Sequence, residues 1–292
     1  MIASASEARV GVSPDPSRVI VTLATSVSAA QVWQALTETS SVAMWFGSLT
    51  AELRPGSPAR LDFGDGDFFT LDDIQLNPPY GLQYTWRFLG IGPKDAITWR
   101  IIPQDAGCLV TVSDDEPERA LELSQDLQEG WLDFIQRLER FLTTGQVTRY
   151  DWRREFEASL ELPDRLPDIW DSLFDTQEQA HWLPLADTPL ASDAHFEIDD
   201  GLDPTRWQIT EVLWNPPTSV QFQLSCPDWR QFTRCYLELF PRPQTTLLRV
   251  KHLGWEGISR NEQEAKRQRQ RFSELWIKTL QQARQIVEPI QE

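Results

Sequence analysis

The sequence has few residues of the kinds that build disulfide frameworks and metal sites. Its three cysteines are too few and too scattered for a disulfide framework or a C-x-x-C metal site (Cys108, Cys226 and Cys235). An odd cysteine count fits a reducing compartment. The three histidines lie far apart along the chain, which argues against a histidine-rich metal site (His181, His195 and His252). We therefore expect no metal and no disulfide bond.

Positive charge is scarce and long apolar runs are absent. The chain carries 27 Lys and Arg against 44 Asp and Glu, a net charge of −17. A nucleic-acid binder needs a basic face to neutralise phosphates, and an anionic membrane repels such an acidic protein. No run of 18 apolar residues could span a membrane, and the N-terminus lacks the apolar stretch of a secretory signal. We expect a cytoplasmic protein that binds neither nucleic acid nor membrane.

The sequence also lacks the local motifs of common active sites. It contains no G-x-S-x-G, no P-loop, no H-E-x-x-H and no G-x-G-x-x-G. The DFGDGD stretch at Asp62–Asp67 resembles a calcium loop in composition but lacks the glutamate at the twelfth position, so we expect a hairpin turn there. No cofactor is expected.

What the chain does have is an internal repeat. Val32–Phe46 returns at Ile169–Leu183, with the two tryptophans of each copy in register, 137 residues apart. Further along, Asn77-Pro78-Pro79 returns as Asn215-Pro216-Pro217 after 138 residues. A constant offset over such distances indicates that one domain of about 130–140 residues is used twice, in agreement with the two domains expected from the length.

Each half has the same predicted order of elements. In the first half Arg18–Val27 alternates like a strand, a helical region follows, and strands separated by turn residues extend to Asp114. An apolar stripe at helical spacing over Leu127–Leu142 then predicts a long helix, and Asn261–Val287 predicts its counterpart in the second half. The predicted boundaries are a flexible tail at 1–16, a domain at 17–145, a linker at 146–150 and a second domain at 151–288.

Several short motifs occur in a characteristic order in the first half: Val32-Trp33, Trp45-Phe46, Asp73-Ile74, Thr85-Trp86, Gly107 before Val110-Thr111-Val112, and Gly130-Trp131. Together they resemble the AHSA1-type domains (activator of Hsp90 ATPase homologue 1-like) of the START/Bet v 1-like, or SRPBCC, superfamily. The resemblance implies an α+β fold with two tandem helix-grip domains, each a curled antiparallel sheet wrapped around a long C-terminal helix. It also implies a cavity between sheet and helix.

The two copies differ where the family motifs end. The second copy has His252-Leu253-Gly254 after its last strand, where the first has Asp114-Asp115-Glu116. The first copy has Gly130-Trp131 in its last helix, where the second has Leu275-Trp276. These complementary departures predict different tasks, with one domain holding a ligand and the other structural or binding a partner.

Alternation along the strands places aromatic side chains on the face toward the last helix. The predicted ligand-binding set is Trp45, Phe46, Tyr84, Trp86, Trp131 and Phe134 in the first domain, and Trp182, Phe222 and Trp276 in the second. Asp114 and His252 end the last strands and are the candidates for acid or base, with pKa values shifted by burial. The alternatives are that both residues cap a strand end in solvent and that the tryptophans only fill the core.

Three functions remain open. The first is binding of a small hydrophobic or aromatic molecule, and the second is a cofactor-independent cyclase of the polyketide cyclase/aromatase kind, acting on an aromatic or indolic substrate of a natural-product pathway. The third is an Hsp90-type co-chaperone or protein-binding module, and a homodimer is also open. A dry cavity favours the first, a buried polar group aimed into a closed cavity favours the second, and large exposed apolar patches favour the third.

Overall fold

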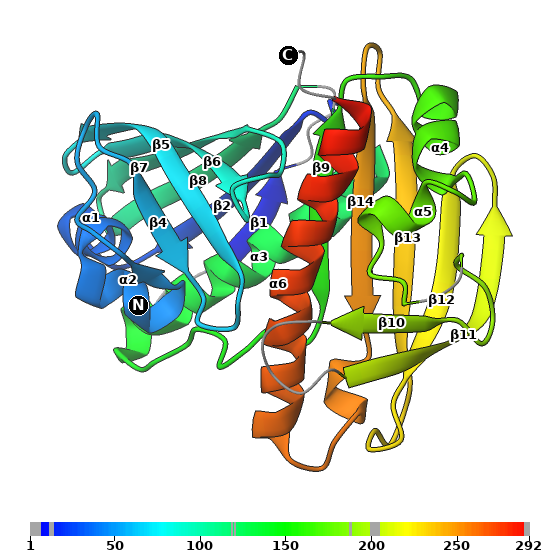
Figure 1. The fold of residues 1–292 in the computed structure, drawn as a ribbon. Coiled ribbons are helices and arrows are strands. Elements are labelled where there is room, and N and C mark those ends of the chain that lie inside the picture. The colour runs from blue at the N-terminus through cyan, green and yellow to red at the C-terminus, as the bar shows by residue number, and fades with distance from the viewer. Residues whose placement is uncertain are drawn as a thin grey trace. The chain divides into compact units, whose positions relative to one another are not determined.

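The computed structural model describes residues 7–11, 15–117, 119, 121–186, 189–198 and 205–288. The chain divides into two compact units, Met1–Asp151 and Trp152–Glu292. Each unit contains one antiparallel sheet and a long last helix (Figure 1). None of the helices in the described ranges has the length and apolarity that crossing a membrane requires.

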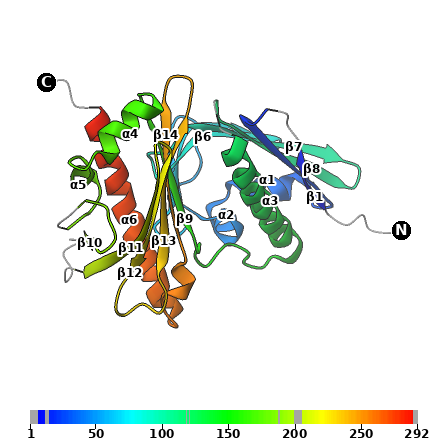
Figure 2. The same ribbon diagram turned by 90° about the vertical axis from the view of Figure 1, so that its right-hand side faces the viewer.

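The first unit is built on an eight-stranded sheet in the order β1-β2-β8-β7-β6-β5-β4-β3. Helices α1, α2 and α3 lie on the same face of this curled sheet (Figure 2). The strands are β1 (Glu7–Gly11), β2 (Arg18–Thr25), β3 (Ser48–Leu49), β4 (Ala59–Asp62), β5 (Phe68–Asn77), β6 (Gly81–Phe88), β7 (Asp95–Gln104) and β8 (Gly107–Asp115). The helices are α1 (Ala29–Thr37), α2 (Thr39–Trp45) and α3 (Leu121–Thr144).

Strand alternation produces the core of the first unit. On β8 every second side chain from Cys108 to Asp114 is buried, and the same alternation over β6 buries Leu82, Tyr84 and Trp86. These side chains meet the buried stripe of α3, formed by Trp131, Ile135 and Leu138. Every second residue of the strands and one stripe of residues at a spacing of about 3.6 along the helix therefore face each other across one core.

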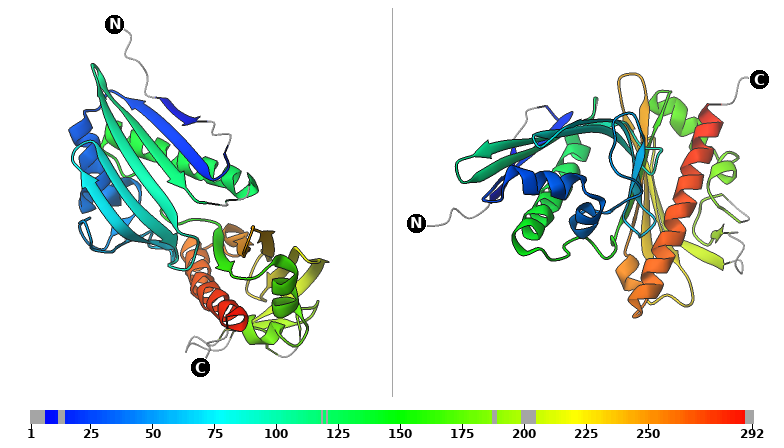
Figure 3. Two further views of the ribbon diagram at one scale, coloured as in Figure 1. Left: turned by 90° about the horizontal axis from the view of Figure 1, so that it is seen from above. Right: turned by 90° about the vertical axis from the view of Figure 1, so that its left-hand side faces the viewer.

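The second unit is built on a six-stranded sheet in the order β10-β11-β12-β13-β14-β9, with α6 lying along one face of it (Figure 3, right-hand view). The strands are β9 (Phe156–Leu162), β10 (His195–Ile198), β11 (Thr205–Asn215), β12 (Ser219–Ser225), β13 (Thr233–Pro241) and β14 (Thr246–Leu253). The helices are α4 (Leu166–Phe174), α5 (Gln179–Trp182), the 3-10 turn η1 (Trp255–Gly257) and α6 (Glu262–Val287). The side chain of Asn261 caps the start of α6 by accepting from the Gln263 amide.

The repeat extends to individual interactions. The indole of Trp45 donates to the carbonyl of Ala35 at 2.8 Å, and the indole of Trp182 donates to the carbonyl of Leu173 at the same distance. Strand β5 has a bulge with a positive φ at Asp73, and β11 has the same irregularity at Glu211. The prediction of two tandem helix-grip domains in an α+β fold is confirmed.

Two predicted boundaries need correction. The expected tail at 1–16 is wrong for Glu7–Gly11, which pair with β2 as strand β1 because the edge of β2 offers open backbone hydrogen-bonding groups. The remaining tail positions 1–6 and 12–14 lie outside the described residues. The expected linker packs on the first unit, where the amide of Thr148 donates to the carbonyl of Met44 at 2.8 Å. Segment 146–150 is therefore part of the first unit's structure.

Gly107 gives a direct test of the packing between β8 and β2. Its φ is +126°, and a Cβ there would lie 2.0 Å from the Thr25 carbonyl oxygen. We expect Gly107→Ala to lower the free energy of unfolding by about 3 kcal/mol, since strained backbone and overpacking add. Gly56 is the matched control, because it also has a positive φ but no atom lies within 4 Å of the position that a Cβ would take. Gly56→Ala should cost about 1 kcal/mol, and equal losses for both variants in urea titrations would contradict the argument.

Candidate functional site

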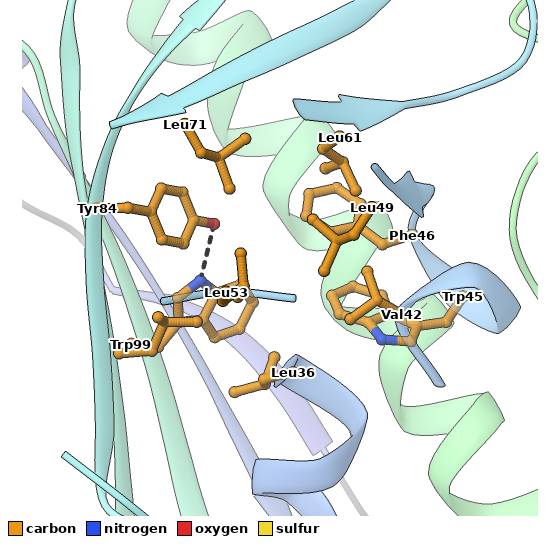
Figure 4. Close-up of a pocket in the computed structure, with 11 residues that line it drawn as sticks. Leu36, Val42, Trp45, Phe46, Leu49, Leu53, Leu61, Leu71, Tyr84 and Trp99 are labelled. Carbon is orange, nitrogen blue, oxygen red and sulfur yellow. Dashed lines mark hydrogen bonds between the residues drawn. The ribbon is translucent and has the colours of Figure 1, made fainter. Parts of the chain in front are cut away.

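A small apolar cavity lies inside the first unit, between the sheet and helices α1 and α2 (Figure 4). Its volume is about 20 Å³, room for about one water molecule. The side chains that line it are aliphatic and aromatic: Leu36, Val42, Trp45, Phe46, Leu49, Leu53, Leu61, Leu71, Leu82, Tyr84 and Trp99. Of the predicted ligand-binding residues, Trp45, Phe46 and Tyr84 line this cavity.

The polar part of the cavity wall is a hydroxyl paired with an indole. Trp99 donates its Nε1 proton to the hydroxyl of Tyr84 at 3.2 Å, and both side chains are buried. The hydroxyl points toward the cavity (Figure 4), and its own proton has no acceptor among the residues that the structure describes. Burial raises the pKa of Tyr84, so the group stays neutral and can donate a hydrogen bond.

The other three predicted ligand-binding residues of this unit form an aromatic layer behind the cavity. Trp86 stacks on Trp131 with ring centroids 5.3 Å apart, and Phe134 contacts Phe46 at 4.6 Å. Trp86, Trp131 and Phe134 are not among the residues that line the cavity. They support its wall through aromatic contacts, which contribute beyond the area they bury.

Asp114 lies on β8 beneath this layer, and its side chain is 1% exposed. The indole of Trp131 donates to its Oδ2 at 2.7 Å, and the guanidinium of Arg119 donates to its Oδ1. Burial raises the pKa of Asp114, although Arg119 and the indole oppose this effect. Asp114 does not cap a strand end in solvent, and it is not among the residues that line the cavity.

Two further carboxyl groups share the Arg119 guanidinium. Glu116 accepts from its Nε at 3.1 Å, and Asp95 lies 3.9 Å from its Nη2 while accepting from the Trp86 indole at 3.3 Å. Burial and the neighbouring carboxylates of Asp114 and Glu116 raise the pKa of Asp95 well above its usual value. With three carboxyl groups around one cation, this network ties β7, β8 and the segment before α3 together. Removing one partner of such a buried network costs several kcal/mol, roughly 3–5.

The second unit places His252 in the position of Asp114. Its ring is buried, with Nδ1 accepting from the Trp276 indole at 3.0 Å and Nε2 lying 2.7 Å from the Thr233 hydroxyl. Because Nδ1 accepts, the proton of the neutral ring sits on Nε2 and is donated to Thr233. Burial, and secondarily the Arg269 cation, lowers the pKa of His252 well below its usual range.

The cavity-facing pair of the first unit has no counterpart at the equivalent positions of the second. At the repeat offset of 138 residues, Phe222 stands where the first unit has Tyr84, and Leu237 where it has Trp99. Phe222 and Trp276 are buried, and both contact Phe196 in an aromatic core. Trp182 is also buried, and its indole donates a hydrogen bond to the carbonyl of Leu173. The predicted ligand-binding residues of the second unit therefore pack as core.

Several residues of the site are not among those predicted from the sequence. Trp99 alternates with Ile97 and Ile101 along β7, so the strand pattern contains the signal for an inward-facing indole. Asp95 carries no local signal, because its cationic neighbour Arg119 follows it by a whole strand. Arg119 stands five residues after Asp114 and three after Glu116, so a local sequence signal existed for those two contacts.

The chain is similar to several known proteins. The family model described as "Activator of Hsp90 ATPase homolog 1-like protein" matches residues 26–143. The crystal structure of DynU16, a protein in the dynemicin biosynthetic locus, is 31% identical with a TM-score of 0.85, over 94% of this chain and 100% of DynU16. CalU16 from Micromonospora echinospora is 20% identical (TM-score 0.38) over 49% of this chain and 88% of its own. MLL2253 from Mesorhizobium loti is 19% identical (TM-score 0.40) over 43% and 96%. No curated protein matches.

The neutral His252 makes the stability of the second unit depend on pH. Since the folded state binds this proton less readily than the unfolded chain, the contribution of His252 to the free energy of unfolding is highest above a pH of about 6.5. It falls below that pH by up to about 1.4 kcal/mol per pH unit. We expect His252→Gln to reduce this dependence, because glutamine can accept from Trp276 and donate to Thr233 without titrating.

The measurement is the free energy of unfolding of the wild type and of His252→Gln, obtained by denaturant titration at several pH values between about 7.5 and about 5. The raised pKa values of Asp95 and Asp114 act with the opposite sign and are present in both proteins, so the difference isolates His252. Identical pH dependence in the two proteins would show that His252 is not held neutral.

Proposed function

This chain belongs to the activator of Hsp90 ATPase homologue 1-like family of the START/Bet v 1-like superfamily, and we propose that its first unit binds a small hydrophobic or aromatic molecule. The site is the cavity bounded by Tyr84, Trp99 and the leucines around them. The observation that carries the proposal is the Tyr84 hydroxyl, a neutral donor aimed into an otherwise apolar chamber. Ligand sites commonly combine an apolar lining with a few convergent polar groups.

The lining sets the polarity of the ligand. None of the residues that bound the cavity is ionised, and Asp114 and Arg119 are engaged with each other behind the aromatic layer. A charged ligand would lose its hydration without gaining a partner, at a cost of several kcal/mol or more. The proposed ligand is therefore neutral and mostly apolar, with an aromatic part that packs against Trp45 and Phe46.

The Tyr84 hydroxyl sets the position of one ligand atom. It already accepts from Trp99, so its remaining capacity toward a ligand is mainly that of a donor. A carbonyl or ether oxygen supplies the acceptor. The proposed ligand accordingly carries at least one such oxygen.

Binding requires side chains to move, since the cavity of about 20 Å³ has room for only about one water molecule. The wall is rich in leucine, and Leu49 and Leu53 come from the short strand β3 and the irregular segment between β3 and β4. Displacing these two disrupts few backbone hydrogen bonds of the sheet. We propose that the ligand enters on this side.

A second candidate is a polyketide cyclase-like enzyme at the same site. Two observations favour it: the buried hydroxyl aimed into a closed cavity, and the whole-length similarity to DynU16, a protein in a biosynthetic locus. In that case Tyr84 would donate to a substrate carbonyl, while the walls hold a reactive chain in one folded pose. The test is whether the protein converts a linear polyketone to a cyclic product faster than buffer does. We expect Tyr84→Phe to lose this activity while it still binds the substrate. A cyclisation rate equal to that in buffer would contradict the enzyme proposal.

The first test of the binding site compares an aromatic ketone with its parent hydrocarbon, such as fluorenone with fluorene, by quenching of tryptophan fluorescence. We expect Tyr84→Phe to weaken ketone binding about fivefold to tenfold, the effect of about 1 kcal/mol for one hydrogen bond. Binding of the hydrocarbon should not change. Leu53→Trp should fill the cavity and abolish binding of both compounds.

Tyr80→Phe is the matched control, because it removes the same hydroxyl from an exposed position. Equal weakening of ketone and hydrocarbon by Tyr84→Phe would contradict the proposed hydrogen bond. Quenching that survives Leu53→Trp would place the ligand elsewhere in the protein.

A further inference from the structure

We infer that a groove on the second unit, between α5 and α6, binds an extended peptide segment of a partner protein that carries an acidic side chain. The groove has a volume of about 500 Å³. Helix α5 and the residues after it form one wall, including His181 and Leu185, and α6 forms the other through Leu275, Lys278 and Gln282. The two helices lie side by side in Figure 1. This site is separate from the proposed ligand cavity.

The internal repeat identifies the corresponding place in the first unit. Trp131 of α3 and Trp276 of α6 hold equivalent positions, since each donates to the ionisable side chain at the end of its last long strand. The buried positions that follow match at the same offset of 145 residues: Ile135 with Leu280, and Leu138 with Ala283. At this offset Lys278 corresponds to Asp133 and Gln282 to Arg137, while His181 corresponds to Met44 at the offset of 137.

In the first unit a segment of the chain occupies that place. The amides of Thr148 and Arg149 donate to the Met44 carbonyl at 2.8 and 3.1 Å. The guanidinium of Arg137 donates to the Thr148 carbonyl at 2.6 Å and stacks over the Tyr150 ring.

Backbone groups make several of these contacts, so the place accepts a peptide in an irregular, extended form. The Tyr150 hydroxyl completes the set by donating to the Asp133 carboxylate at 2.7 Å. The groove of the second unit thus lies at the place where the first unit holds a segment of its own chain, and the repeat indicates the kind of occupant.

The charge at the key position is reversed between the two units. Asp133, an acceptor for Tyr150, is replaced by Lys278, an exposed cation with no salt-bridge partner among the described residues. The other charged groups that line the groove are paired within it or at its rim, Arg206 with Glu197 at 2.8 Å and His181 with Glu178 at 3.1 Å. A peptide that fits here therefore presents a carboxylate where segment 146–150 presents a hydroxyl donor.

The probe is a display library of random heptapeptides selected against the full chain, followed by titration of the enriched peptide by fluorescence polarisation. We expect enrichment of peptides with an Asp or Glu at one fixed position. Lys278→Gln should weaken binding about threefold to fivefold, as for one partly exposed ion pair, and Ala180→Trp should abolish it by filling the groove. Selection against Lys278→Glu should enrich a basic residue instead.

Gln281→Glu is the matched control, because it makes the same change in net charge on an exposed position of α6 outside the groove. It should leave the affinity unchanged. Three results would each overturn the inference. The first is that no peptide is enriched, and the second is that the enriched peptides share no fixed acidic position. The third is that Ala180→Trp or Lys278→Gln binds the enriched peptide with the affinity of the wild type.

Discussion

In each unit, one indole on the last helix must find an acceptor on the last long strand. Trp131 donates to Asp114 and Trp276 donates to His252, at 2.7 and 3.0 Å. Both indoles are buried where no solvent can replace the partner, and a buried donor without an acceptor costs about 1–3 kcal/mol. The bond also fixes how far the helix sits along the sheet, because it joins the two layers at one defined point. The curled sheet and the helix it holds are positioned by this contact.

The choice of acceptor determines what else each unit requires. A carboxylate satisfies the indole but brings a charge into the core, and the first unit surrounds it with Arg119 and, through that cation, with Glu116 and Asp95. A neutral imidazole has both an acceptor and a donor, so His252 satisfies Trp276 and Thr233 without a counter-ion. The different residues at this position are thus two solutions to the same packing problem. In both units the side chain at this position is hydrogen-bonded within the core.

Much of the fold is predictable from the sequence because it follows from local periodicity and from the repeat. Alternation on β6 and β8 is enough to place Tyr84, Trp86 and Asp114 on the side of the helix, and the repeat fixes two domains of one architecture. The partners of these side chains are not predictable, since a period gives the face of a strand but not the distance between strands. For this reason the strand pattern makes Asp114 a candidate acid or base but does not reveal its hydrogen bonds to Trp131 and Arg119. Strand β1 is not predictable either, because its pairing depends on an edge of β2 that only the folded sheet creates.

The two copies share one architecture but differ at particular positions. The first unit keeps a hydroxyl donor in its cavity, and its own segment 146–150 covers the place between its short second helix and its last helix. The second unit has Phe222 and Leu237 in place of the donor pair, and its groove between α5 and α6 is open to solvent in the described residues. A polar group inside a core is tolerated only where something satisfies it, and a groove persists on a surface only where packing does not require its closure. The interior of the first unit and the surface of the second therefore carry the two features on which the proposals rest.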